Sequence, residues 1–111
     1  MPRIAIPVVD GNLSPHFGHC QNFVLYDVDD GQHTNTVVVD SPPHQPGMLP
    51  RWLAEQNVTE ILSGGMGQRA IALFNQYKIN VYVGVPAKTP EELLTDYLAG
   101  SLETNENMCD H

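Results

Sequence analysis

The stretch over residues 3–9, Arg-Ile-Ala-Ile-Pro-Val-Val, places the strongest constraint on how this chain folds. Every position after Arg3 is apolar, and Ile and Val dominate. A short continuous run of this kind favours a β-strand that is covered on both faces. At 111 residues the chain has the length of one domain, so these covering layers must come from the same compact unit.

Four more stretches have the composition of strands. Turn-forming residues at 29–32 join the first two of these stretches into a hairpin. Residues 11–18 are dense in turn formers and predict a loop, and three prolines make segment 41–47 irregular. The predicted strands cover residues 23–28, 34–39, 60–63 and 79–83.

Three helices are predicted after the hairpin. The first covers residues 48–56, and the second follows the glycine-rich segment 64–67. The third has the clearest boundaries, because Thr89 and Glu92 have the spacing of a capping box and Gly100 suits a helix end. These signals are local and do not depend on the rest of the fold.

The resulting order is β-β-β-α-β-α-β-α, which predicts an α/β fold with a mixed five-stranded sheet and flanking helices. Right-handed crossovers would place the strands that start near residues 3, 60 and 79 parallel and adjacent. This is an RNase H-like, three-layer arrangement. We expect residues 1–100 to form a single metal-cluster-binding domain and residues 101–111 to be a flexible tail with Cys and His.

The charge of the chain excludes one class of partner. Thirteen acidic residues against five basic ones give a net charge of −8, which would repel nucleic acid. No apolar stretch approaches the ~20 residues that cross a bilayer, and the N-terminus lacks the features of a signal peptide. Two cysteines are too few for a disulfide framework, so the sequence predicts a cytoplasmic protein with no membrane contact.

Side chains that can bind metal gather in three segments. His16 and Cys20 lie in the first loop, His44 in the proline-rich segment, and Cys109 and His111 at the C-terminus. In open α/β sheets, ligands bind in the loops at the carboxyl ends of the strands. Thiolates favour copper(I), zinc and iron–sulfur centres, and imidazole suits most transition metals. The pattern predicts a metal site without choosing the metal.

Each of these residues also has a structural explanation. Cys20 could be a small buried apolar side chain, and His44 could brace the proline-rich segment. His19 and His33 are expected to face solvent. A polar tail has no packing reason to end in a thiol and an imidazole, so Cys109 and His111 could close over a bound centre.

The glycine-rich segment offers a second kind of ligand group. Gly64, Gly65, Met66 and Gly67 precede a helix, where backbone N–H groups and the helix dipole favour an anion. Arg69 could add a cation in the first helical turn. The segment lacks the Lys and Ser/Thr of a P-loop, which leaves a nucleotide unsupported. Close packing of helix on strand is the structural alternative.

Together these motifs resemble the dinitrogenase iron–molybdenum cofactor biosynthesis family. The resemblance rests on Ser-Pro-His-Phe-Gly-His-Cys at 14–20, Pro-Pro-His-Gln-Pro-Gly at 42–47, Gly-Gly-Met-Gly-Gln-Arg-Ala at 64–70 and Cys-Asp-His at 109–111. It implies an RNase H-like fold and the binding or transfer of iron–molybdenum or other metal–sulfur clusters. Stand-alone relatives include an orange protein that holds a molybdenum–copper sulfide cluster. Under this resemblance, His16 and the loop 64–67 fall where such clusters are expected.

We therefore expect a carrier or scaffold for a metal–sulfur cluster, of Fe–Mo–S, Mo–Cu–S or Fe–S type, and not an enzyme. Its partners would be proteins that donate or accept the cluster, and the chain would be a monomer or weak homodimer. The alternative is a mononuclear zinc or iron module that uses His16, Cys20, Cys109 and His111. A two-metal nuclease is disfavoured, because the first strand is apolar where that chemistry needs carboxylates. A redox pair of Cys20 and Cys109 is a weaker possibility.

Overall fold

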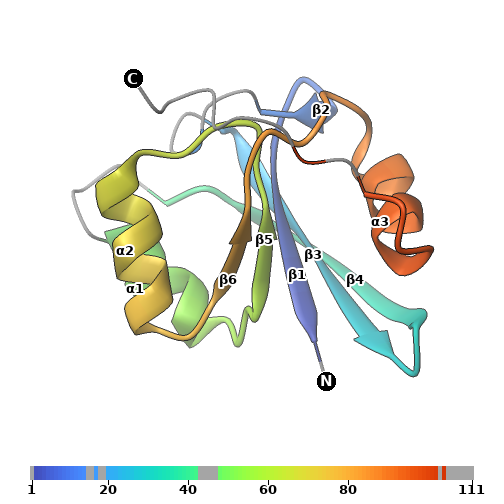
Figure 1. Ribbon diagram of the computed structural model, residues 1–111, viewed down its shortest axis with the longest axis horizontal. Coiled ribbons are helices and arrows are strands. Elements are labelled where there is room, and N and C mark those ends of the chain that lie inside the picture. The colour runs from blue at the N-terminus through green and yellow to red at the C-terminus, as the bar shows by residue number, and fades with distance from the viewer. Residues whose placement is uncertain (1, 15–16, 18–19, 43–47, 103, 105–111) are drawn as a thin grey trace.

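A computed structural model describes residues 2–14, 17, 20–42, 48–102 and 104. Within these residues the chain forms six strands and three helices around one mixed sheet (Figure 1). The strands are β1 (Arg3–Val9), β2 (Asn12–Leu13), β3 (Asn22–Asp29), β4 (Gln32–Asp40), β5 (Glu60–Leu62) and β6 (Asn80–Tyr82), and the helices are α1 (Met48–Glu55), α2 (Gln68–Gln76) and α3 (Pro90–Leu98).

The strand order across the sheet is β4-β3-β1-β5-β6, with β2 paired to β1. β1 pairs antiparallel with β3 and parallel with β5, and β5 pairs parallel with β6. The predicted parallel, adjacent placement of the strands near residues 3, 60 and 79 is therefore confirmed. The carboxyl ends of these three strands lie at the same edge of the sheet, at the top of Figure 1.

Two helical layers cover the sheet, with α1 and α2 on one face and α3 on the other (Figure 1). Alternate residues of β1 explain this arrangement. Ile4, Ile6 and Val8 belong to the core cluster that includes Leu93 and Leu94 of α3. The residue between the first two, Ala5, belongs to the second cluster, with Leu53 of α1 and Phe74 of α2. Because successive side chains of a strand point to opposite faces, the apolar strand β1 contributes side chains to both core clusters. The three-layer α/β class is confirmed.

The number of strands differs from the prediction, which was five. The sixth, β2, forms because the chain reverses directly after β1. Asp10 (φ 52°) and Gly11 (φ 81°) make the turn, and Leu13 then pairs with Val8. Leu13 is buried on the α3 side of the sheet, so a short return strand replaces the beginning of the predicted loop 11–18.

The end of the fold carries the predicted helix signals. The Thr89 hydroxyl accepts a hydrogen bond from the Glu92 backbone N–H, and the Glu92 carboxylate accepts one from the Thr89 N–H. The capping box is therefore confirmed, and Gly100 (φ 74°) ends the segment in the left-handed region. In the ranges that the structure describes, no helix combines the length and apolar character needed to cross a membrane.

Candidate cofactor site at the carboxyl ends of the parallel strands

The loop after β5 lies between the loops that follow β2 and β6. The Phe17 backbone N–H donates to the Gly65 carbonyl oxygen at 2.9 Å. On the other side, the Gly84 N–H donates to the Gly64 carbonyl oxygen at 3.0 Å. The first loop, which contains Cys20, and the glycine loop were expected to share one end of the sheet, and the hydrogen bond from Phe17 joins them there.

The glycine loop is anchored from inside. Ser63 is fully buried, and its hydroxyl donates to the Gly65 carbonyl oxygen at 2.9 Å. Met66 is also buried and belongs to the core cluster beneath α1 and α2. The Met66 side chain therefore points into the core, which leaves backbone groups of this loop as its means of contact with a ligand.

The exposed part of the glycine loop is the start of α2. Gly67 is the N-cap residue (φ −64°, ψ 150°), and no side chain caps the helix there. The first N–H groups of a helix have no partner within the helix, and they favour an anion. A Cβ atom added at Gly67 would meet no atom within 4 Å, so the surface over these amides is open. Arg69 is exposed in the first turn of α2.

Cys20 lies at the other side of this end of the sheet. It is half-buried and packs against the core cluster that contains Met66 and Phe74. Phe17 packs beside this cluster too, with its ring centroid 5.4 Å from that of Phe74 and 5.8 Å from that of Phe23. The sequence assigned no role to Phe17, yet its ring holds the first loop against the core. A large apolar residue within a run of turn formers is the sequence feature that could have indicated this role.

Four predicted metal ligands, His16, His44, Cys109 and His111, lie outside the described residues, as do His19 and most of the tail 101–111. Their roles stay predictions. In the described part of the chain, no group of three or more His, Cys, Asp or Glu side chains is arranged to hold a metal ion. His33 is exposed on β4, where it bonds to the Thr36 hydroxyl and stacks edge-on against Tyr26, away from this site.

The basic residues of the chain are distributed unevenly. Arg3 pairs with Asp27 at 2.7 Å, and Lys88 pairs with Asp96 at 3.0 Å. The Arg3 guanidinium, through its hydrogen bonds, holds the pKa of Asp27 below its ordinary value. The other three basic residues belong to the α1/α2 layer: Arg51, Arg69 and Lys78.

These groups fit an anionic, sulfur-rich cofactor. The amides at the start of α2 and the Arg69 side chain favour negative charge, and Cys20 supplies one soft ligand group on the same face of the sheet. The space beside Gly67 is open, so side chains do not cover the backbone there. The described residues alone do not complete the coordination of a bare metal ion.

The chain is similar to known proteins over almost its whole length. A family model described as dinitrogenase iron-molybdenum cofactor matches residues 1–100. An uncharacterised protein of Methanocaldococcus jannaschii is 29% identical over 109 residues, covering 94% of this chain and 92% of that protein. The crystal structure of PH0822 superposes with a TM-score of 0.87 at 32% identity, covering 93% of this chain and 94% of that one.

The apo form of the orange protein from Desulfovibrio gigas shares the fold, with a TM-score of 0.76 at 24% identity, covering 96% of this chain and 95% of that one. The family match includes β1, the glycine loop and all three helices. Because it spans almost the whole chain, this protein belongs to the dinitrogenase iron–molybdenum cofactor family.

Proposed function

We propose that this protein binds and carries, or scaffolds, a metal–sulfur cofactor where the loops after β2 and β5 meet. Family membership associates the chain with a metal cofactor. The observation that supports this location is the hydrogen bond from the Phe17 N–H to the Gly65 carbonyl. It holds the loop that contains the predicted ligands His16 and Cys20 against the loop that opens α2. The cofactor would be an Fe–Mo–S, Mo–Cu–S or Fe–S cluster.

In this proposal the protein binds and shields the cofactor and catalyses no reaction. The amides after Gly67 and the Arg69 guanidinium face the anionic sulfides, and the Cys20 thiol contributes a soft contact. His16, His44, Cys109 and His111 are the predicted ligands that complete the set. A carrier of this kind needs a site that opens for transfer, and the start of α2 is exposed.

A mononuclear zinc or iron site is the alternative. Its support is the half-buried Cys20 thiol, which belongs to the same short motif as His16. Thiol and imidazole are the ligands of structural zinc sites. The two proposals differ in one measurable quantity, because a cluster brings inorganic sulfide and a lone ion does not.

The decisive experiment is purification of the full chain without oxygen, followed by measurement of bound metals and acid-labile sulfide per chain. The same measurement follows incubation with iron plus sulfide, or with thiomolybdate plus copper. Stoichiometric metal with sulfide and a visible charge-transfer band supports the cluster carrier. Tight zinc or iron without sulfide favours the single-ion site. No metal under any of these conditions contradicts both.

Variants locate the cofactor. Cys20→Ser and Arg69→Gln should each lower cluster retention, because they remove a soft ligand group and a positive charge. Arg51→Gln is the matched control for Arg69, since Arg51 is an equally exposed arginine on α1 of the same layer. Equal losses in Arg69→Gln and Arg51→Gln would mean that only overall charge matters, and would remove Arg69 from the site.

A further inference from the structure

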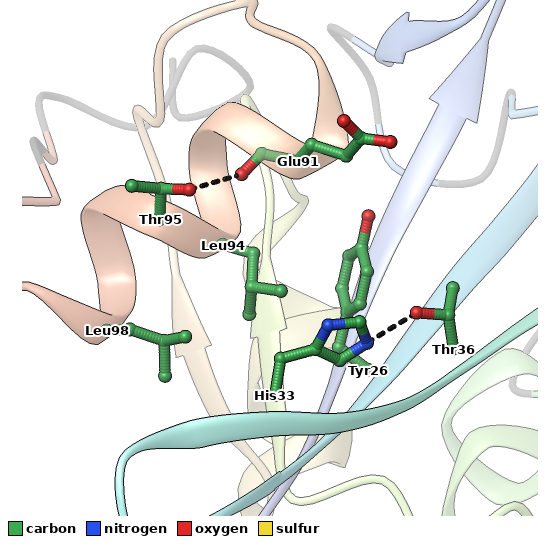
Figure 2. Close-up of a pocket in the computed structure, with 7 residues that line it drawn as sticks. All are labelled: Tyr26, His33, Thr36, Glu91, Leu94, Thr95 and Leu98. Atoms are coloured by element: carbon green, nitrogen blue, oxygen red, sulfur yellow. Dashed lines mark hydrogen bonds between the residues drawn. The ribbon is translucent and has the colours of Figure 1, made fainter.

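A groove runs between α3 and the β3–β4 hairpin, on the face of the sheet opposite α1 and α2 (Figure 2). One part of it has a volume of about 360 Å³ and is lined by Tyr26, Thr36, Glu91 and Leu98, among others. A second part of about 390 Å³ shares Tyr26, Thr36 and Glu91 and extends to Val38 and Gly11.

The floor of the groove is apolar, and its rim carries one carboxylate, Glu91, with His33 and Thr36 on the side of β4. Val38 is 60% exposed on β4, next to the buried ring of Tyr26. Leu94 and Leu98 of α3 form the facing wall. In Figure 2 the Glu91 side chain extends over the side of the groove where the Tyr26 hydroxyl lies. Burial, together with the Glu91 charge, raises the pKa of Tyr26, so the hydroxyl stays protonated and can donate or accept hydrogen bonds.

The charge around the groove selects its occupant. Every Lys and Arg of the chain either belongs to the α1/α2 layer or is paired with an aspartate. No Lys or Arg therefore pairs with the Glu91 carboxylate in the described part of the chain, and His33 is the imidazole that lines the groove with it. A second copy of the chain carries the same charge of −8, and segment 103–111 contains three acidic residues and no Lys or Arg. Net electrostatic repulsion opposes both as occupants, and docking of the basic α1/α2 layer of a second copy would appear in the titration below as shifts that depend on protein concentration.

We propose that this groove docks a basic segment of a partner protein, with an apolar side chain on Tyr26 and Val38 and a Lys or Arg beside Glu91. A basic segment with interspersed apolar residues matches both the floor and the rim. The groove begins at Gly11, directly after β1, and thus reaches the edge of the sheet where the cofactor loops lie. Identifying the partner as a cluster donor or acceptor rests on the proposed function; the docking itself does not.

The test is an amide NMR titration of the metal-free full chain with an acetylated, amidated heptapeptide, Lys-Val-Lys-Leu-Lys-Val-Lys. We expect saturable shifts concentrated at Tyr26, Thr36, Val38 and Glu91. A peptide with Glu for every Lys should not bind, and one with Ser for every apolar residue should bind more weakly. Shifts centred on α1 and α2, or shifts that depend on protein concentration without peptide, would overturn the proposal.

Three variants separate docking from general charge attraction. Glu91→Gln should weaken binding of the basic peptide by about threefold, the size expected for an exposed ion pair. Glu55→Gln removes an equally exposed carboxylate on α1 and should have no such effect. Val38→Thr keeps the shape of an exposed strand residue and should weaken binding through the apolar contact. Equal effects of Glu91→Gln and Glu55→Gln would refute the groove. Because the titration uses metal-free protein, its outcome is independent of the cofactor measurement.

Discussion

Two substitutions at Gly67 can decide the sign of the charge that the site accepts. Asn and Asp are both good N-cap residues, at least as good as Gly, so Gly67→Asn and Gly67→Asp should leave α2 intact. The backbone of Gly67 (φ −64°, ψ 150°) suits any residue, and a Cβ there meets no atom within 4 Å. The two variants have nearly the same shape and differ by one negative charge at the start of α2.

The size of the difference follows from Coulomb's law. A carboxylate about 5 Å from a unit negative charge on the cofactor costs about 0.8 kcal/mol in a water-like dielectric, and about 3 kcal/mol at an effective dielectric of about 20. Gly67 is exposed, so the lower value applies. We expect the Asp variant to bind an anionic cluster at least about fourfold more weakly than the Asn variant, with the gap narrowing as salt is added. For a zinc or iron cation the Coulomb energy has the opposite sign, so the Asp variant should bind the cation more tightly than the Asn variant.

The assay is reconstitution with thiomolybdate plus copper, or iron plus sulfide, with binding followed by visible absorbance as protein concentration is varied. A parallel titration uses zinc alone. Urea unfolding of both variants checks that their free energies of unfolding are similar, with a small advantage for Asp from the helix dipole. Equal cluster affinities of the Asp and Asn variants would refute the placement of an anion at α2. Tighter metal binding by the Asp variant would favour the mononuclear site.

Three further substitutions test the framework that positions the site. Thr89→Ala removes the hydroxyl that accepts from the Glu92 backbone N–H at the start of α3, and should lower the free energy of unfolding by about 1 kcal/mol, measured by urea denaturation. Asp27→Asn breaks the ion pair with Arg3. The side chains of Asp27 and Arg3 are 19% and 24% exposed, so the loss in free energy of unfolding should be less than about 1 kcal/mol. Folding lowers the pKa of Asp27, so the ionised carboxylate stabilises the folded state. This stabilisation is complete above the unfolded-state pKa of about 3.9, and it is lost as pH falls through the lower pKa of the folded state. The wild type should therefore lose more stability than this variant on acidification in that range. Ser63→Ala removes the buried hydrogen bond to the Gly65 carbonyl and should cost about 1 kcal/mol, with faster amide exchange in the glycine loop; unchanged exchange would show that the hydroxyl does not hold the loop.

Features with local causes could be predicted from the sequence. The capping box at Thr89 and Glu92 depends on residues three positions apart, and the structure contains both of its hydrogen bonds. The parallel placement of β1, β5 and β6 follows from right-handed crossovers over two βα units. β2 was missed, although Asp10-Gly11 is a strong turn signal, because a strand of two residues has no periodicity to detect.

The candidate site is harder to predict because it depends on contacts between distant segments. The hydrogen bond between Phe17 and Gly65 joins loops that are separated in the sequence by three strands and a helix. The inward position of Met66 depends on how α2 packs on the sheet, since a methionine beside glycines suits either a ligand or a core position. The sequence could nominate the two loops, but only the packing shows that backbone groups of the glycine loop, rather than the Met66 thioether, are available to a ligand.

The fold places the charged residues of the chain on different faces, which the net charge alone does not reveal. A value of −8 argues against polyanionic partners, yet the proposed cofactor is itself an anion. The fold reconciles these two facts, because the basic residues that form no ion pair with another described residue lie in the α1/α2 layer, Arg69 among them, and Glu91 lies on the α3 side. One face can then accept a small anion through local amides and one guanidinium, while the opposite face attracts a basic protein segment. A carrier needs both properties at once, since a partner must be held beside the protein while the cofactor is transferred.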